Sequence, residues 1–399
     1  MPRDFVRLWA GQTVSLFGSE VTQLALPLVA AVVLGASPAE MGLLRAVQFV
    51  PELLALPVGL LVDCVGHRRL LMLADVGRAL ALGTIPLAAL AGTLRLPQLY
   101  LVALLSGALT VVFGVAYQAY LPSLLEPPAR LQGNSRLALS RSAAVAAGPA
   151  LAGVLVQAFS APLAIVADAV SFLASAGSLL LIRAPDRRAP AGRPMDLLAG
   201  LRFVLHDPLL RTVALASALW NFFSGGVWDA LYVVYLSREL QLSAVEIGGL
   251  FTTVGLAGVA SALLSRRVLN RVGIGPAYVG AGVLASLAML VIAASSSVLM
   301  LGLAAACVGS SFPVFLVAGA TIQQECTPEP LRGRVAAGLR SVVVGVVPLG
   351  ALLGGALGEA LSPRAGLVVA ALGLLLVPLS VFASPLRSLH ALAGRVPSG

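Results

Sequence analysis

Long apolar stretches alternate with short polar connections along the whole chain. A helix needs about 20 mainly apolar residues to cross a bilayer, and this criterion predicts twelve spanning helices. Most connections between them are very short, whereas residues 183–208 form one long polar connection with several arginines. The predicted spans are Leu8–Leu34, Met41–Val62, Leu70–Ala91, Gln98–Leu121, Leu137–Phe159, Leu163–Ile182, Leu209–Leu236, Ile247–Val268, Ala277–Ser295, Val298–Ile322, Val335–Leu361 and Gly366–Phe382.

We therefore expect an all-α integral membrane protein with two pseudo-symmetric six-helix bundles. Residues 1–182 would form the first bundle, 183–208 a cytoplasmic linker, and 209–399 the second bundle with a short cytoplasmic tail. Internal similarity supports a duplication. Three residues of the fifth span recur 199 positions later in the eleventh, and three of the first recur 209 positions later in the seventh: Arg141, Ser142 and Pro149 as Arg340, Ser341 and Pro348, and Gln12, Ser15 and Glu20 as Asn221, Ser224 and Asp229.

The composition narrows the class of protein. Hydrophobic residues make up 59% of the 399 residues and charged residues only 11%, whereas soluble domains carry about 25%. This charge is too small to cover a soluble surface, which excludes a soluble enzyme, a nucleic-acid binder and a disordered chain. A membrane-embedded enzyme is disfavoured because the three histidines lie in loops or tails and no phosphate-binding loop motif is present. We expect no enzymatic activity, cofactor, metal or nucleic-acid partner.

The basic residues indicate the orientation in the membrane. All 26 are arginines, and the formal net charge is +9. With the N-terminus inside, nineteen arginines fall on the cytoplasmic side and three outside, as cytoplasmic retention of arginine requires. Four more lie within spans: Arg45, Arg78, Arg141 and Arg340. We expect a multi-pass protein of a bacterial inner membrane with both termini in the cytoplasm, whose charge reports topology rather than a partner.

A short motif follows the second predicted span. Its residues are Gly59, Asp63, Gly66, Arg68 and Arg69. This pattern resembles the signature between the second and third helices of the major facilitator superfamily. The resemblance implies that the loop holds the two halves together when the transporter opens outward. A simple loop that only sets topology is the alternative.

A second motif lies in the fifth span, where Arg141 precedes Gly148, Pro149 and Gly153. Proline kinks a helix, and small neighbours let other helices approach. The motif resembles the glycine-proline motif of the superfamily's exporters, although alanines replace two of the usual glycines. The chain also resembles the macrolide-efflux and enterobactin-exporter-like branch, a drug:proton antiporter branch. The resemblance rests on residues 8–12 with Ser15, Gly18 and Pro27, on Asp75 and Arg78, on residues 168–172 and on residues 331–335. The arginine that many such antiporters carry in the fourth span is missing.

Ionisable groups inside a span are costly and therefore functional candidates. Glu20 and Asp229 are the best candidates for proton coupling, followed by Asp168 and Glu52. Each has a structural alternative, such as a helix-packing hydrogen bond for Asp168 and an ion pair with Arg45 for Glu52. Four further residues are expected in a cytoplasmic charge network with Asp63: Asp75, Arg78, Glu325 and Arg340. Within it, a pair of Asp63 with Arg340 would bridge the two halves.

Polar and aromatic stripes on the first and seventh spans suit helices that line a central cavity. The candidate substrate contacts are Gln12, Ser15, Ser19, Gln23, Asn221, Ser224, Trp228 and Tyr232. Together the features predict a secondary active exporter of a hydrophobic or amphipathic small molecule, working by alternating access in exchange for protons and functional as a monomer. An importer or uniporter of the same fold is the alternative within transport. A non-transporting receptor or scaffold is less favoured because it need not keep Asp63 or the buried acids.

Overall fold

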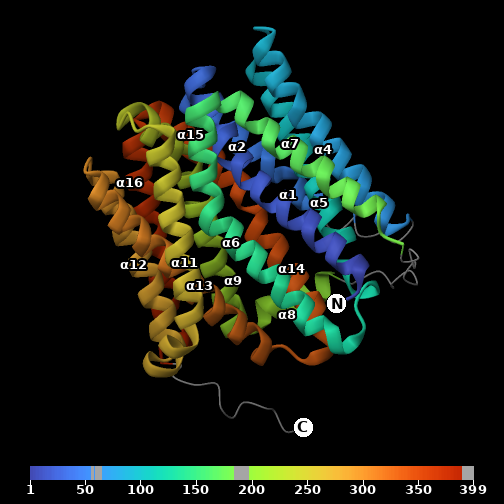
Figure 1. The fold of residues 1–399 in the computed structure, drawn as a ribbon. Helices are drawn as coiled ribbons and strands as arrows, with labels where there is room; N and C mark the ends of the chain where they lie inside the picture. The colour runs from blue at the N-terminus through green and yellow to red at the C-terminus, as the bar shows by residue number, and fades with distance from the viewer. Residues whose placement is uncertain (55–57, 59–64, 184–196, 389–399) are drawn as a thin grey trace. The chain divides into compact units, whose positions relative to one another are not determined.

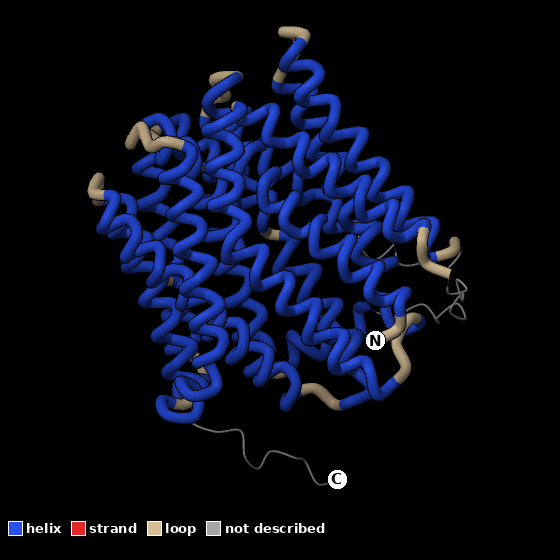
Figure 2. Tube along the Cα trace, in the orientation of Figure 1, coloured by secondary structure: helices blue, strands red, loops and turns tan. Residues whose placement is uncertain are grey.

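The computed structural model describes residues 1–54, 58, 65–183 and 197–388 of the chain. Among these residues the secondary structure is helical throughout, without a strand (Figure 2). Within the described residues, ten helices are long and apolar enough to cross a membrane. They are Arg3–Val33, His67–Leu90, Leu96–Ser123, Pro127–Phe159, Ala161–Leu180, Ala244–Val272, Ile274–Ala294, Val298–Cys326, Glu329–Ala360 and Pro363–Phe382.

These ten helices match ten of the twelve predicted spans. The other two predicted spans, the second and the seventh, are not among these ten helices. The second predicted span begins as α2 (Pro38–Phe49) and η2 (Val50–Leu54), after which most of it lies outside the described residues. The seventh is one helical run that changes its winding three times. It passes through α9 (Pro208–Trp220), the π-helical η4 (Asn221–Trp228), α10 (Asp229–Val234) and the π-helical η5 (Tyr235–Glu239).

Contacts divide the chain into two compact units, Met1–Arg193 with Val233–Thr252, and Pro194–Tyr232 with Thr253–Gly399. Of the segments named above, α2, η2 and η5 belong to the first unit, α9 and η4 to the second, and the boundary falls within α10. The first unit also contains α1 (Arg3–Leu28), η1 (Val29–Val33), α4 (His67–Leu90), α5 (Leu96–Tyr120), η3 (Leu121–Ser123), α6 (Pro127–Phe159), α7 (Ala161–Leu180) and the start of α11 (Ala244–Val272). The second contains the rest of α11 and α8 (Leu197–His206), α12 (Ile274–Ala294), α13 (Val298–Cys326), η6 (Glu329–Leu331), α14 (Arg332–Gly345), α15 (Val347–Ala360), α16 (Pro363–Leu374), α17 (Leu376–Phe382) and η7 (Pro385–Ser388).

Polar side chains and prolines define where several helices begin. Ser37 and Glu40 form a reciprocal capping box before α2, with the Ser37 backbone N–H donating to the Glu40 carboxylate at 2.7 Å. Asp207 accepts from the backbone N–H groups of Leu209 and Leu210, both at 2.9 Å, at the start of α9. Proline stands within the first turn at each of these starts, where its missing N–H costs no intrahelical bond.

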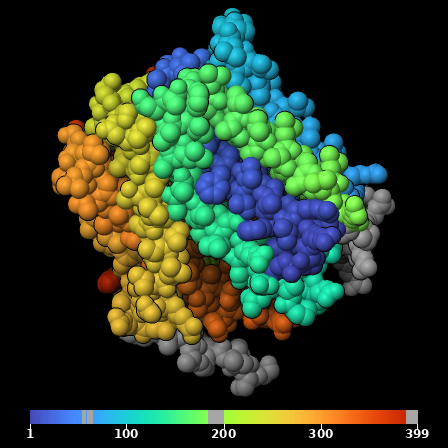
Figure 3. Space-filling view, in the orientation of Figure 1, coloured from blue at the N-terminus to red at the C-terminus, as the bar shows by residue number. Residues whose placement is uncertain are grey.

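In the first unit, α1 lies between α6 and α7 (Figure 1), and the space-filling view shows it as a blue band flanked by their green surfaces (Figure 3). Towards α7, α1 presents Gly11 and Gly18. A Cβ on Gly11 would lie 2.8 Å from the Ser178 Cβ and 3.2 Å from the Ser175 Cα, so only glycine permits this approach. Small residues therefore bring the two helices into direct backbone contact.

The opposite face of α1 contacts α6 through polar groups. The indole Nε1 of Trp9 donates to the Ser140 Oγ at 2.9 Å, and the Thr13 hydroxyl lies 2.9 Å from the same atom. Ser140 is buried, with 6% of its surface exposed. Hydrogen bonds of this kind hold helices together inside a membrane, where the hydrophobic effect does not.

Arginines close the C-terminal ends of two helices. Arg68 of α4 donates to the carbonyls of Leu179 and Leu180 at 2.8 and 2.9 Å, at the end of α7. In the second unit Arg364 does the same for α12, donating to Ala293 and Ala294 at 2.7 and 2.9 Å. The last carbonyls of a helix have no intrahelical partner and carry the negative end of its dipole, so a guanidinium satisfies both.

Candidate functional site

Glu20 lies where α1 meets the glycine-proline segment of α6. The Glu20 side chain packs onto Gly148, and a Cβ at Gly148 would lie 2.5 Å from the Glu20 Cβ and 2.8 Å from its Cγ. Glu20 is half-buried, and the positive charge of Arg141 acts on its carboxylate. Arg141 itself is exposed, two helical turns before Gly148 on α6. The structure thus brings together a predicted proton-coupling acid and two residues of the predicted exporter-like motif.

The remaining motif residues of α6 contact the start of α11 within the first unit. A Cβ on Gly153 would lie 2.6 Å from the carbonyl oxygen of Ala244, and one on Gly248 would lie 2.5 Å from that of Pro149. Gly148, Pro149 and Gly153 are all buried. The motif therefore serves as a surface for close backbone contact on two sides, with α1 and with α11.

A second cluster of polar groups is fully buried between α1, α4 and α7. Arg78 donates to the Asp75 carboxylate through Nη2 at 2.5 Å, and its charge also acts on Asp168. The Arg78 guanidinium carbon lies 4.6 Å from the ring centre of Phe113 and 4.0 Å from that of Phe172. A guanidinium over the face of an aromatic ring gains cation–π attraction. Asp75, Arg78 and Asp168 expose 0%, 6% and 1% of their surfaces.

Serines and one amide extend this cluster. The Ser171 hydroxyl donates to Asp168 Oδ1 at 3.1 Å and to the Asp168 carbonyl at 2.8 Å. The Ser175 hydroxyl lies beside the Asp75 carboxylate and accepts from Gln12 Nε2 at 3.1 Å. Asp168 thus shares a helix face with Ser171 and Ser175, a spacing of three and seven that is visible in the sequence but was not used for prediction.

The residues of the polar stripe predicted on α1 lie in different surroundings. Gln12 points into the buried cluster and Ser15 is buried, whereas Ser19 is half-buried and Gln23 is exposed.

In η2, Glu52 is half-buried, and the Arg45 guanidinium of α2 lies 4.4 Å from the ring centre of Phe49. These residues remain candidates, and they do not form one continuous surface.

The loop motif is described only in part. Gly59 and Asp63 lie outside the described residues, and so does the pairing expected of Asp63 with Arg340, which is exposed. Gly66 immediately precedes α4, Arg68 caps the end of α7, and Arg69 is exposed. The two arginines of the motif therefore have different surroundings.

In the second unit the predicted candidates lie on or just after the π-helical segment η4. Asn221 donates to the Ser217 carbonyl at 3.0 Å and Ser224 is half-buried. Trp228 and Tyr232 are buried, with ring centres 5.2 Å apart, whereas Asp229 is exposed. A π-helical turn in a spanning helix is frequent at functional sites.

Aromatic side chains and glycines pack around η4. The Phe315 ring stacks between Trp220 and Tyr278, with both centroid distances 4.4 Å. A Cβ on Gly226 would lie 2.7 Å from the Cα of Gly350 in α15, so the two backbones touch. Of these residues, Gly350 belongs to the region that repeats the glycine-proline motif. The packing of the three aromatic rings against one another was not predicted from the sequence.

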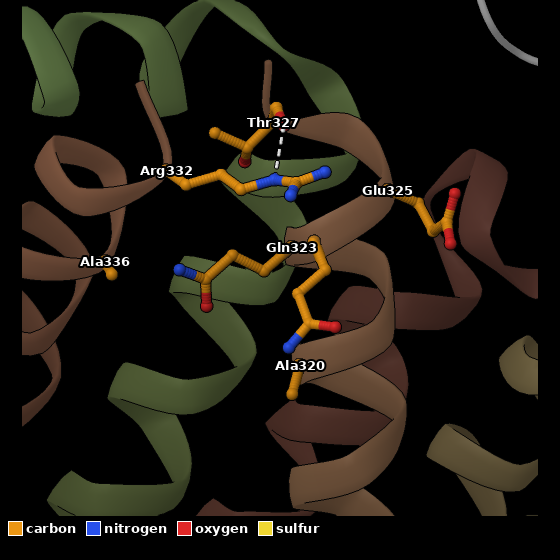
Figure 4. Close-up of a pocket in the computed structure, with 7 residues that line it drawn as sticks. Ala320, Gln323, Glu325, Thr327, Arg332 and Ala336 are labelled. Atoms are coloured by element: carbon orange, nitrogen blue, oxygen red, sulfur yellow. Dashed lines mark hydrogen bonds between the residues drawn. The ribbon is translucent and has the colours of Figure 1, made fainter. Parts of the chain in front are cut away.

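A polar cavity of about 530 Å³ lies where α13 ends and α14 begins (Figure 4). Arg332 crosses it and donates to the Thr327 carbonyl at 3.4 Å. Glu325, which was predicted to belong to the cytoplasmic charge network, lies in its lining. Its lining residues are Ala320, Gln323, Gln324, Glu325, Thr327, Arg332 and Ala336.

Spanning helices with acids buried among them are typical of a membrane transporter. Comparison with known proteins agrees: the family model described as "Transmembrane secretion effector" matches residues 2–397. The chain belongs to this family of the major facilitator superfamily.

Individual curated proteins and solved structures are also similar to the chain. The multidrug efflux pump Tap of Mycolicibacterium fortuitum is 26% identical over 351 residues, 83% of each chain. The enterobactin exporter EntS of Escherichia coli O1:K1 / APEC is 29% identical over 215 residues, 53% of this chain and 50% of EntS. The nucleoside transporter NupG shares the fold with a TM-score of 0.76 at 12% identity, over 96% of this chain and 98% of NupG. The predicted fold class is thereby confirmed.

Proposed function

We propose that the protein is a secondary active exporter that moves a hydrophobic or amphipathic small molecule out of the cell by alternating access, in exchange for protons. It would act as a monomer in a bacterial inner membrane, with both termini in the cytoplasm. Family membership and the efflux activity in the names of similar proteins support export. Protons and the membrane potential would supply the driving force.

The observation that carries the proposal is the contact of Glu20 with Gly148. An acid within a spanning helix is costly, which makes it a functional candidate. Here it packs directly on the helix that bears the exporter-like motif, with Arg141 as the acting positive charge. A change of protonation at Glu20 would alter the attraction to Arg141 and with it the packing of α1 on α6. Coupling between proton binding and helix movement needs such a contact.

The test uses everted membrane vesicles that contain the full chain and a pH-sensitive dye. After acidification of the vesicle interior by respiration, addition of ethidium as an amphipathic probe should cause proton efflux from the vesicles. Glu20→Gln should abolish this movement. Glu126→Gln, the same change at an exposed glutamate before α6, is the matched control and should leave it intact.

The same assay separates export from the alternative. An importer or uniporter of this fold would accumulate no probe inside everted vesicles against a gradient, whether or not protons moved. Ethidium accumulation that depends on the proton gradient supports export. If a panel of amphipathic cations, anions and neutral compounds neither accumulates nor moves protons, the proposal is wrong.

A further inference from the structure

The buried cluster between α1, α4 and α7 contains more negative than positive charge. Asp75 and Asp168 are carboxylates, and Arg78 is the guanidinium that acts on both. With all three ionised the cluster carries one uncompensated negative charge, although Asp75 and Asp168 expose 0% and 1% of their surfaces. An uncompensated buried charge is strongly unfavourable and is relieved by neutralisation. One bound proton balances the cluster.

We propose that Asp75, Arg78 and Asp168 form a proton-binding site that holds one exchangeable proton, carried by Asp168. The inference rests on the proposed proton exchange for its role in transport and names a site beyond Glu20 for it. The ligand is a proton: the Asp168 carboxylate takes it up to become a carboxylic acid, while Arg78 keeps its charge. The site lies wholly in the first unit.

The geometry decides which acid carries the proton. Arg78 Nη2 donates directly to Asp75 Oδ1 at 2.5 Å, so the charged pair uses Asp75. Asp168 instead accepts a hydrogen bond from the Ser171 hydroxyl at 3.1 Å. Among the described residues, the charged groups that act on Asp168 are Arg78 and Asp75, whereas Arg141 of α6 acts on Glu20.

One hydrogen-bond donor of Arg78 is available to Asp168 once Asp168 has lost its proton. The Nε atom of Arg78 is buried and, within the described part of the chain, has no hydrogen-bond partner. A buried donor without an acceptor is unfavourable. When Asp168 loses its proton, its carboxylate becomes an acceptor and a countercharge for Arg78. The rings of Phe113 and Phe172 lie beside the guanidinium and help to keep it between the two acids.

The position of the site links this exchange to helix packing. Asp75 and Arg78 belong to α4 and Asp168 to α7, so a shift of Arg78 towards Asp168 changes the attraction between these helices. On the other side, a Cβ on Gly18 of α1 would lie 2.7 Å from Asp168 Oδ1. The α1 backbone therefore covers the carboxylate and responds to its state.

The test counts protonated carboxylic acids by their infrared carbonyl band in the purified full-length protein in nanodiscs at neutral pH. Counts are compared between variants in a Glu20→Gln background, so that Glu20 does not contribute. Asp168→Asn should lose one protonated acid. Asp75→Asn should also lose one, because Asp168 then pairs with Arg78 and stays ionised. Arg78→Gln should gain one, because two carboxylates then lack a countercharge.

The double variant Asp75→Asn with Arg78→Gln should return to the count of the background protein, since one carboxylate remains without a countercharge. This variant is charge-balanced like the native site and serves where a single variant fails to fold, as judged by monodisperse elution. Glu126→Gln should change nothing. Sodium in the site would leave no acid band to lose, and the inference would be wrong.

Two outcomes separate this inference from the proposed function. If the acid count follows the charge arithmetic while ethidium moves no protons, the site binds a proton but the proposed exchange fails. If protons move with ethidium while Asp75→Asn keeps the Asp168 acid or Arg78→Gln gains none, the exchange stands and the assignment of this site is overturned.

Discussion

Gly148 and Glu20 are in direct contact, with the glycine's missing side chain making room for the acid. Gly148→Ala would push Glu20 away from α6, and overpacking of this kind costs about 1–3 kcal/mol. If the contact couples proton binding to transport, ethidium-driven proton movement should fall about tenfold, since each 1.4 kcal/mol is a factor of ten. The measurement is the initial rate of dye response in everted vesicles. Gly177→Ala, at a spanning glycine with open space around it, is the control and should transport normally.

Gly18 tests the contact of α1 with α7. Gly18→Ala places a methyl group against Ser171 and 2.7 Å from Asp168 Oδ1. We expect a loss of about 1–3 kcal/mol of stability, seen as a lower apparent Tm of the purified protein. Adding Ser171→Ala removes one of the clashing atoms and should recover part of the loss. Full stability in Gly18→Ala alone would contradict the close packing described for α1 and α7.

Arg68 and Arg69 are adjacent in the loop motif but should differ in their effect on stability. Arg68→Ala leaves the carbonyls of Leu179 and Leu180 without the guanidinium, at a cost of about 1 kcal/mol for a partly exposed group. Arg69→Ala removes an exposed side chain and should be neutral. Arg68→Lys should fall between, because an ammonium lacks the planar fork. Thermal unfolding of the three variants distinguishes this role from one in which the two arginines are equivalent.

Gly350 tests the backbone contact of α15 with η4. A Cβ at this position would meet the carbonyl oxygen of Phe222 and lie 3.1 Å from the Gly226 Cα, and backbone atoms have little freedom to move aside. We expect Gly350→Ala to cost about 3 kcal/mol, at the upper end for overpacking. Gly302→Ala on α13 adds a methyl group in open space and should be tolerated. Equal melting temperatures for the two variants would show that the helices are not in such close contact.

Much of the fold follows from the sequence because a bilayer allows few solutions. Apolar length alone located ten spans, and the small residues of α6 indicated where helices approach closely. The association of Glu20 with Gly148 was not foreseen, although both residues were singled out. Sequence spacing places residues on a helix face, but it does not say which helix that face will meet.

For the buried cluster, too, the sequence did not show which helices would meet. Asp75 and Arg78 were expected in a cytoplasmic network with Asp63, and the structure places them beside Asp168, nearly a hundred residues later. In the second half the winding of the helix adds a further difference. Asp229 matches Glu20 in the repeat, but it follows the π-helical η4 and is exposed, whereas Glu20 lies in a regular α-helix and is half-buried. A local change from α to π winding rotates every later side chain and leaves no clear mark in the residue pattern.

The glycine contacts at two levels of α1 bear on how this helix can travel during transport. Gly11 receives Ser178 and Gly18 receives Ser171, and the two glycines are two helical turns apart on α1. Surfaces that interlock at two separated points resist sliding past one another, so shear between α1 and α7 is unfavourable. We expect the pair to rotate as one rigid body. Spin labels at Val14 and Leu173, both exposed, should therefore keep a constant separation while the transporter changes state.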